Sequence, residues 1–196
     1  VSNTIPYFDG GVSISRTARV FPTYLIFKPA MFITAFFLIQ YWRFNSDLME
    51  KISPYLNYKK FFLFFGIGSA IFLFLHSIFL GIKFDNDLYK LFRRTIILFF
   101  IIFEVVAQTL LIINLYKIKI QIKKSINSKI LNFKIGLVAI LIIVAILSIP
   151  FITASGYVYL KHALEWNYFV GVISFYLLTF LLWKSHKPSV HTPESV

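Results

Sequence analysis

Five apolar blocks of about 20 residues constrain this chain more than any other feature. An α-helix rises about 1.5 Å per residue, so about 20 apolar residues cross a hydrocarbon core about 30 Å thick. The blocks are rich in Phe, Ile and Leu and lack the sustained alternation of apolar and polar residues that marks a transmembrane barrel strand. We predict an all-α fold, a polytopic transmembrane helix bundle with helices at residues 21–42, 61–82, 95–116, 133–154 and 163–183.

Composition supports an integral membrane protein. Of the 196 residues, 58% are hydrophobic and 14% are charged, whereas about a quarter of a soluble domain is charged. The chain has no cysteine, which excludes disulfides and thiolate metal sites. The net charge of +12 does not indicate a nucleic-acid partner, because Lys and Arg in the loops of a multi-span protein set its orientation. We expect a multi-pass membrane protein with no cofactor.

The distribution of basic residues predicts the orientation. Twelve Lys and Arg residues follow the first, third and fifth blocks or begin the fourth, and seven lie before the first block and in the other loops. The richer side is predicted to be cytoplasmic. Residues 1–20 are then a lumenal or extracellular loop, and residues 185–196 are a cytoplasmic tail of the same single domain, 1–196. Because no signal-peptide pattern precedes that loop, we expect a sixth helix upstream that carries it across the membrane.

Four ionisable residues lie inside the apolar blocks: Lys28, His76, Glu104 and Glu165, with His162 at the edge of the last block. Such residues cost at least about 2.5 to 3.5 kcal/mol in the bilayer and are often functional. Helix rise places them all in the half of the membrane nearer the loop 1–20. The candidate catalytic residues of one polar pocket there are Glu165, Glu104, His76 and His162.

Three interpretations of that pocket remain open. His162 and Glu165 are three residues apart and share a helix face, so together with His76 and Glu104 they have the residue types of a bundle metal site. A carboxylate beside a histidine also suits a general base acting on water or a lipid hydroxyl. The third interpretation is structural: an interfacial ion pair, hydrogen-bonded packing, or a partner for Glu104 such as Lys28 or Gln108. We assign no metal ion.

Three further residues are candidates for contact with lipid headgroups at the outer boundary: Lys28, Arg16 and Trp166. A lysine near a helix end can extend its ammonium group to the interface. On the other side, the loop "KIKIQIKKSINSK", residues 117–129, has the charge to bind anionic lipid, although orientation alone also explains it.

Two stretches resemble the Frag/DRAM/Sfk family of membrane proteins. The stretch "HALEWNYFVGVISFYLLTFLLW" is similar to the family's last helix through Ala163, Glu165, Trp166, Tyr176, Leu178, Thr179 and Phe180. The stretch "VSISRTARVFPTYLIFK" resembles its first lumenal loop through Ile14, Ser15, Thr17 and Pro22, with Arg16 where the family usually has an acidic residue. A middle stretch, "RRTIILFFIIFEVVAQTLL", looks like the branch of the post-attachment GPI-anchor processing factor of the Golgi.

The resemblance implies six helices, cytoplasmic termini and a role in lipid biology. Our leading hypothesis is GPI-anchor lipid remodelling on the lumenal leaflet, in the Golgi, the endoplasmic reticulum or another endomembrane rather than the plasma membrane, with membrane lipids as partners. The alternative is a non-enzymatic scaffold that binds a partner membrane protein or lipid and regulates autophagy or phosphoinositide and lipid organisation. A small transporter or channel is the third hypothesis, and it requires a polar path through cytoplasmic helix halves that are expected to be apolar.

Overall fold

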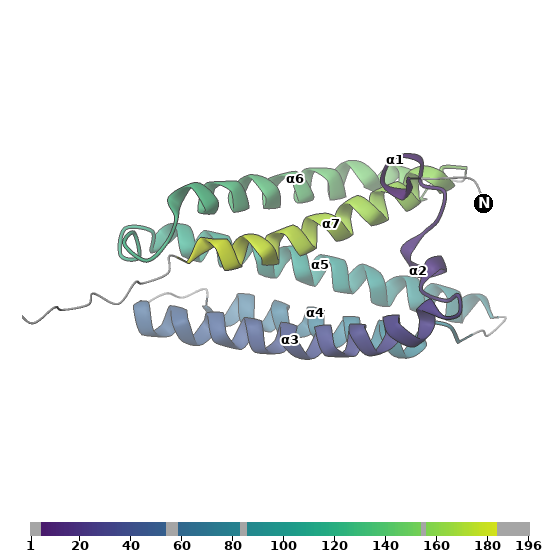
Figure 1. Ribbon diagram of the computed structural model, residues 1–196, viewed down its shortest axis with the longest axis horizontal. Coiled ribbons are helices and arrows are strands. Elements are labelled where there is room, and N and C mark those ends of the chain that lie inside the picture. Colours follow the sequence, from purple (N-terminus) through teal and green to yellow (C-terminus); the bar gives the residue numbers. More distant parts are fainter. Residues whose placement is uncertain (1–4, 54–58, 83–85, 154–155, 184–196) are drawn as a thin grey trace, which may run out of the picture.

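The computed structural model describes residues 5–53, 59–82, 86–153 and 156–183. Five long helices run antiparallel along the long axis of the molecule (Figure 1), and each is long and apolar enough to span a membrane. They are α3 (Thr23–Ile52), α4 (Lys59–Phe79), α5 (Asp87–Lys117), α6 (Ser128–Thr153) and α7 (Val158–Leu182). The described ranges contain no β-strand, and every element in them is a helix. The predicted all-α, multi-span architecture is confirmed, and the predicted tail lies outside the described residues.

All five long helices extend beyond the predicted blocks at one end or both, so the predicted bounds differ from the observed ones. Helix α3 continues ten residues past 42 because its continuation is amphipathic: Asn45, Ser46 and Met49 are buried, whereas Arg43 and Asp47 are exposed. A hydropathy block marks where a helix is apolar on all sides. It therefore misses the turns at which a helix leaves the hydrocarbon but still packs on its neighbours.

Local capping sets several of the other ends. Helix α5 begins eight residues before the predicted block because the side chain of Asn86 accepts a hydrogen bond from Leu88 N (3.0 Å). The predicted block that ends at residue 82 is too long, because Gly81 adopts a φ of 88° and α4 ends at Phe79. A glycine in this left-handed region is a common helix stop.

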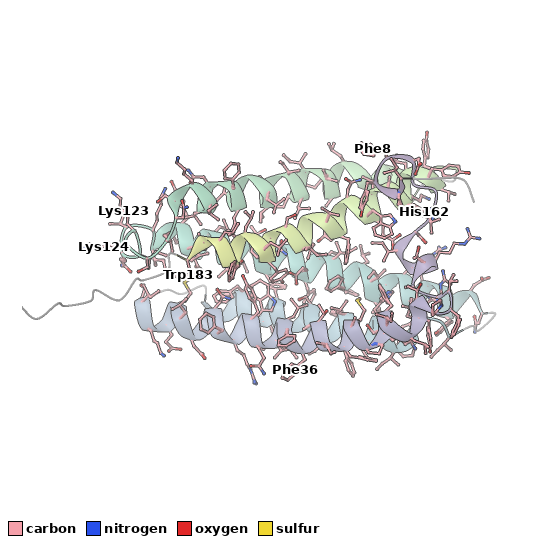
Figure 2. All side chains as sticks on the ribbon, in the orientation of Figure 1. Phe8, Phe36, Lys123, Lys124, His162 and Trp183 are labelled. Carbon is pink, nitrogen blue, oxygen red and sulfur yellow. The ribbon has the colours of Figure 1, made fainter. Side chains whose placement is uncertain are left out.

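The helices pack in chain order: α3 on α4, α4 on α5, α5 on α6 and α6 on α7. Helices α3 and α7, the first and last of the long helices, contact each other through side chains. The rings of Tyr41 and Tyr176 pack edge to face, with their centroids 4.9 Å apart. Many large apolar side chains point outward, such as Phe36 in Figure 2, which is 58% exposed. An apolar exterior of this kind suits contact with lipid.

The predicted loop 1–20 is partly helical. It forms two single turns, α1 (Pro6–Asp9) and α2 (Ile14–Thr17), which lie against the start of α7 (Figure 1). Gly10 ends α1 with a φ of 61°, and a side chain there would collide with the backbone carbonyl of Tyr159. We call this the capped end of the bundle, and we call the opposite end, where the α5–α6 connection lies, the loop end.

The contact between α3 and α4 predicts that Gly66→Ala destabilises the protein. A Cβ atom at Gly66 would lie 2.3 Å from the nearest ring atoms of Trp42, which is fully buried. We expect a loss of about 1 to 3 kcal/mol, the usual cost of overpacking, measured as a lower midpoint of thermal unfolding in detergent.

Gly136→Ala is the matched control for that substitution. Gly136 lies in α6, and apart from its chain neighbours and the adjacent helix backbone, no atom of the described residues lies within 4 Å of the position that an alanine methyl group would take. Alanine there should be neutral or stabilise by up to about 1 kcal/mol. Equal midpoints for the two variants would contradict the close α3–α4 contact.

Candidate functional site

The carboxylate of Glu104 lies at the centre of a buried polar cluster. Glu104 is in the middle of α5 and is completely buried. Its Oε1 accepts hydrogen bonds from Gln108 Nε2 (2.8 Å) and from the hydroxyl of Tyr176, and its Oε2 accepts one from Ser69 Oγ (2.8 Å). These donors come from α4, α5 and α7, so one carboxylate joins three helices.

The cluster continues toward the loop end through Thr179, which follows Tyr176 by one turn on the same face of α7. Its hydroxyl donates to the Phe175 carbonyl (3.0 Å) and therefore accepts from Tyr41 (3.2 Å) and from Lys134 Nζ. All five long helices thus contribute to what we call the interior network: Tyr41, Ser69, Glu104, Gln108, Lys134, Tyr176 and Thr179.

Lys134 is the second charged member of the interior network. Its side chain is fully buried, and its ammonium group lies 3.8 Å from the centroid of the Phe175 ring. In the described ranges no carboxylate forms an ion pair with Lys134. Glu104 and Lys134 carry opposite formal charges and are linked through the hydroxyl groups of α7, because Tyr176 bonds one and Thr179 bonds the other.

The geometry around Glu104 is that of a satisfied structural group. Both carboxylate oxygens already accept hydrogen bonds, which is the condition under which burial of a polar group is tolerated. A cavity of about 300 Å³ borders the network between α3 and α7, and it is lined by Tyr41, Phe44, Asn45, Tyr176, Thr179, Phe180 and Trp183. Glu104 does not line it, so the phenol and hydroxyl groups separate the carboxylate from that space.

A second polar cluster lies at the capped end, where the first turns of α7 hold the N-terminal segment. Trp166 Nε1 donates to Val12 O (2.8 Å), and Asn167 Nδ2 donates to Tyr7 O (2.9 Å). His162 Nδ1 bonds the carbonyl of Gly10 (2.9 Å), and Glu165 Oε1 accepts from Ser15 N (3.4 Å). We call His162, Glu165, Trp166 and Asn167 the α7 clamp.

A cavity of about 360 Å³ lies beside the α7 clamp and is lined by Val12, Arg16, Thr17, Val20 and Thr23. Arg16 is exposed there. Arg19 is also at this end, and its Nε donates to the carbonyl of Ser15 (2.8 Å), which helps to fix α2. The capped end therefore combines a cavity, an exposed guanidinium group and a half-buried carboxylate within one small region.

The structure does not bring the four predicted pocket residues together. Glu165 precedes Tyr176, the α7 partner of Glu104, by eleven residues, or about 16 Å along the helix axis. His76 lies seven residues beyond Ser69, about 10 Å from the Glu104 contact. Within the described part of the chain, no group of three or more His, Cys, Asp or Glu side chains is placed to hold a metal ion.

Each remaining predicted residue has its own environment. His76 Nδ1 is buried without a hydrogen-bond partner among the described residues. Lys28 Nζ donates to the carbonyl of Ile78 (3.2 Å) and lies over the Tyr24 ring, so it joins α3 to α4 rather than pairing with Glu104. Trp166 packs under the N-terminal segment, with the Tyr7 ring at 5.5 Å.

Sequence reasoning missed Lys134 as an interior residue because it was counted among the loop lysines. Helix α6 begins at Ser128, so Lys134 lies well inside it. A detectable signal was its spacing: Leu131, Val138 and Leu141 are buried, and Lys134 falls on the same helical face. The helix halves toward the loop end, which we predicted to be cytoplasmic and apolar, also bury the polar residues Lys134 and Asn45.

Comparison with known proteins identified no similar protein. No model of a known protein family matches the chain, and no curated protein and no solved structure matches it. The fold and the two polar clusters define the class: a polytopic helical membrane protein with a polar interior and an N-terminal segment packed on one end.

The interior network predicts that Tyr176→Phe destabilises the bundle. The substitution removes one donor to Glu104 and leaves a buried carboxylate oxygen with fewer partners, at a cost of about 1 to 3 kcal/mol. Thermal unfolding in detergent measures this loss. Tyr159→Phe is the control, since Tyr159 is 69% exposed, and its midpoint should be unchanged. A Tyr176→Phe midpoint equal to that control would contradict the network.

The α7 clamp predicts that Trp166→Phe loosens the N-terminal segment. Phenylalanine keeps a ring beside Tyr7 but does not donate to Val12 O. Hydrogen exchange and limited proteolysis within residues 5–18 should accelerate several-fold, while exchange in α4 stays unchanged. Ile173→Val, at a position on the same helix that is 41% exposed, serves as the control. Unchanged exchange in Trp166→Phe would contradict the clamp.

Proposed function

We propose that this chain is a lipid-handling membrane protein of the Frag/DRAM/Sfk type that remodels GPI-anchor lipid on the lumenal leaflet of an endomembrane. One observation carries the proposal: the two stretches on which the resemblance rests lie against each other at the capped end. Ser15 N donates to Glu165 across 150 positions of sequence, and Trp166 donates to Val12 O. Stretches that act together in one site are expected to meet in this way.

The chemistry of the capped end supports contact with a phosphate-bearing lipid. Arg16 presents an exposed guanidinium group at a cavity of about 360 Å³, and guanidinium groups bind phosphate through two parallel hydrogen bonds. Glu165 is half-buried on α7 and accepts a long hydrogen bond of 3.4 Å from Ser15 N, the residue before Arg16. In this proposal Arg16 holds the headgroup and Glu165 takes the proton from a lipid or water hydroxyl.

A non-enzymatic scaffold is the second candidate, and the burial of Glu104 among hydrogen-bond partners favours it. Three donors occupy the oxygens of this carboxylate, and Glu165 and His76 lie elsewhere. Under this alternative the interior network is purely structural, and the protein acts by binding lipid or a partner membrane protein at its surface.

The remodelling proposal predicts that Glu165→Gln loses activity while the protein still folds. Glutamine keeps an oxygen that accepts from Ser15 N but does not act as a base. In cells lacking GPI-lipid remodelling, the wild-type chain should restore remodelled lipid on surface GPI-anchored proteins, measured by mass spectrometry. Glu165→Gln should restore less than a tenth of it at equal protein level, and Arg16→Gln should be impaired.

The controls separate catalysis from stability and from the scaffold alternative. Ser128→Ala, at the start of α6 and far from the capped end, should restore remodelling fully. Full restoration by Glu165→Gln at equal protein level would contradict a catalytic role for Glu165 and favour the scaffold. A wild-type chain that is present in the membrane but restores nothing would contradict GPI remodelling itself.

A further inference from the structure

The cavity between α3 and α7 opens toward the lipid-facing surface near the loop end. Phe44 and Phe180 line it and are 62% and 84% exposed, so its rim faces the space that hydrocarbon chains occupy. Trp183, which directly follows α7, lines its end. Asn45 and Thr179 add polar groups, and the rest of the lining is aromatic. This space of about 300 Å³ is open on one side and has mostly apolar walls, which suits a hydrocarbon chain.

The lysine-rich connection 118–127 folds against the same end of the bundle. Ile118, Ile122 and Ile126 are spaced four residues apart, and all are buried. Asn127 N donates to Leu182 O (2.8 Å), and Ile126 forms an isolated bridge with Trp183. The connection is therefore an ordered platform attached to the end of α7, next to the residue that lines the cavity.

The outward face of this platform is basic and carries one prominent apolar side chain. Lys123 and Lys124 are exposed and extend away from the platform, at the same end of the molecule as Trp183 (Figure 2). Neither forms an ion pair within the described residues. Ile120 lies in the sequence between Lys119 and these two lysines, and its side chain is 88% exposed. Lysines around an exposed apolar residue are characteristic of surfaces that rest on anionic membranes.

We propose that the loop end binds one anionic phospholipid from the adjacent leaflet. The headgroup lies on Lys123 and Lys124, and one acyl chain enters the cavity between Phe44 and Phe180. Charge complementarity selects the anionic headgroup, because each lysine near the surface favours it by electrostatic attraction. The apolar, laterally open cavity selects a hydrocarbon chain over a soluble anion. This site is at the opposite end from Glu165 and does not depend on the proposed remodelling activity.

Trp183 provides a direct readout of chain entry. The full chain is reconstituted in nanodiscs of phosphatidylcholine, and brominated phosphatidylserine or brominated phosphatidylcholine is titrated in. Bromine atoms on the acyl chain quench nearby tryptophan fluorescence. The difference between the wild-type chain and Trp183→Phe isolates the contribution of Trp183 from those of Trp42 and Trp166.

We expect brominated phosphatidylserine to quench Trp183 at a mole fraction at least tenfold lower than brominated phosphatidylcholine. Lys123→Gln and Lys124→Gln should each weaken this preference by roughly fivefold, and the double variant should nearly abolish it. Arg94→Gln is the matched control, because it removes one exposed charge at the capped end and should leave the preference intact. Glu165→Gln should also leave it intact.

Three outcomes would overturn the proposal. Equal quenching by the two lipids, or a double lysine variant that keeps the preference, would show that the platform does not select an anionic headgroup. The Phe180→Cys variant has a single cysteine and tests whether the cavity is instead an interface between two copies of the chain. A disulfide-linked dimer under mild oxidation, together with no quenching of Trp183, would show such an interface. The lipid site predicts that this variant stays monomeric.

Discussion

The structure depends on a carboxylate placed where there is no water to solvate it. In the hydrocarbon interior every polar group needs a protein partner, because the bilayer offers none. Glu104 meets this condition through Ser69, Gln108 and Tyr176. Apolar packing alone gives little directional preference between helices in lipid, since lipid tails are as apolar as the side chains they replace. Hydrogen bonds to a single buried acceptor therefore fix which faces of α4, α5 and α7 turn inward.

The rest of the bundle follows from that arrangement. Once Tyr176 faces Glu104, Thr179 is held one turn away, where it meets Tyr41 of α3 and Lys134 of α6. Side chains rather than close backbone packing then join α3 to α7. This leaves an aromatic cavity on the lipid side of the seam. The same polar contacts that close the bundle thus produce the opening that we assign to an acyl chain.

Hydropathy predicted the number and order of the long apolar helices, because crossing a bilayer imposes a length and an apolar composition on each helix. It did not predict which polar groups meet. The depth estimate put Glu104 and Glu165 in one half of the membrane, yet about 16 Å along α7 separates Glu165 from Tyr176, the partner of Glu104. The two carboxylates therefore belong to different clusters. Tertiary structure explains the polar start of α7, because His162 and Trp166 hydrogen-bond to the backbone of the N-terminal segment. The sequence of that segment has no periodic pattern that predicts where it packs.

A double-mutant cycle between Glu104 and Tyr176 tests the central claim most directly. The free energy of unfolding in detergent is measured for the wild-type chain, Glu104→Gln, Tyr176→Phe and the double variant. A direct hydrogen bond to a buried carboxylate predicts a coupling energy of about 1 to 3 kcal/mol, with the double variant less destabilised than the sum of the single variants. Additive effects, within about 0.5 kcal/mol, would show that the two side chains do not interact and would contradict the account.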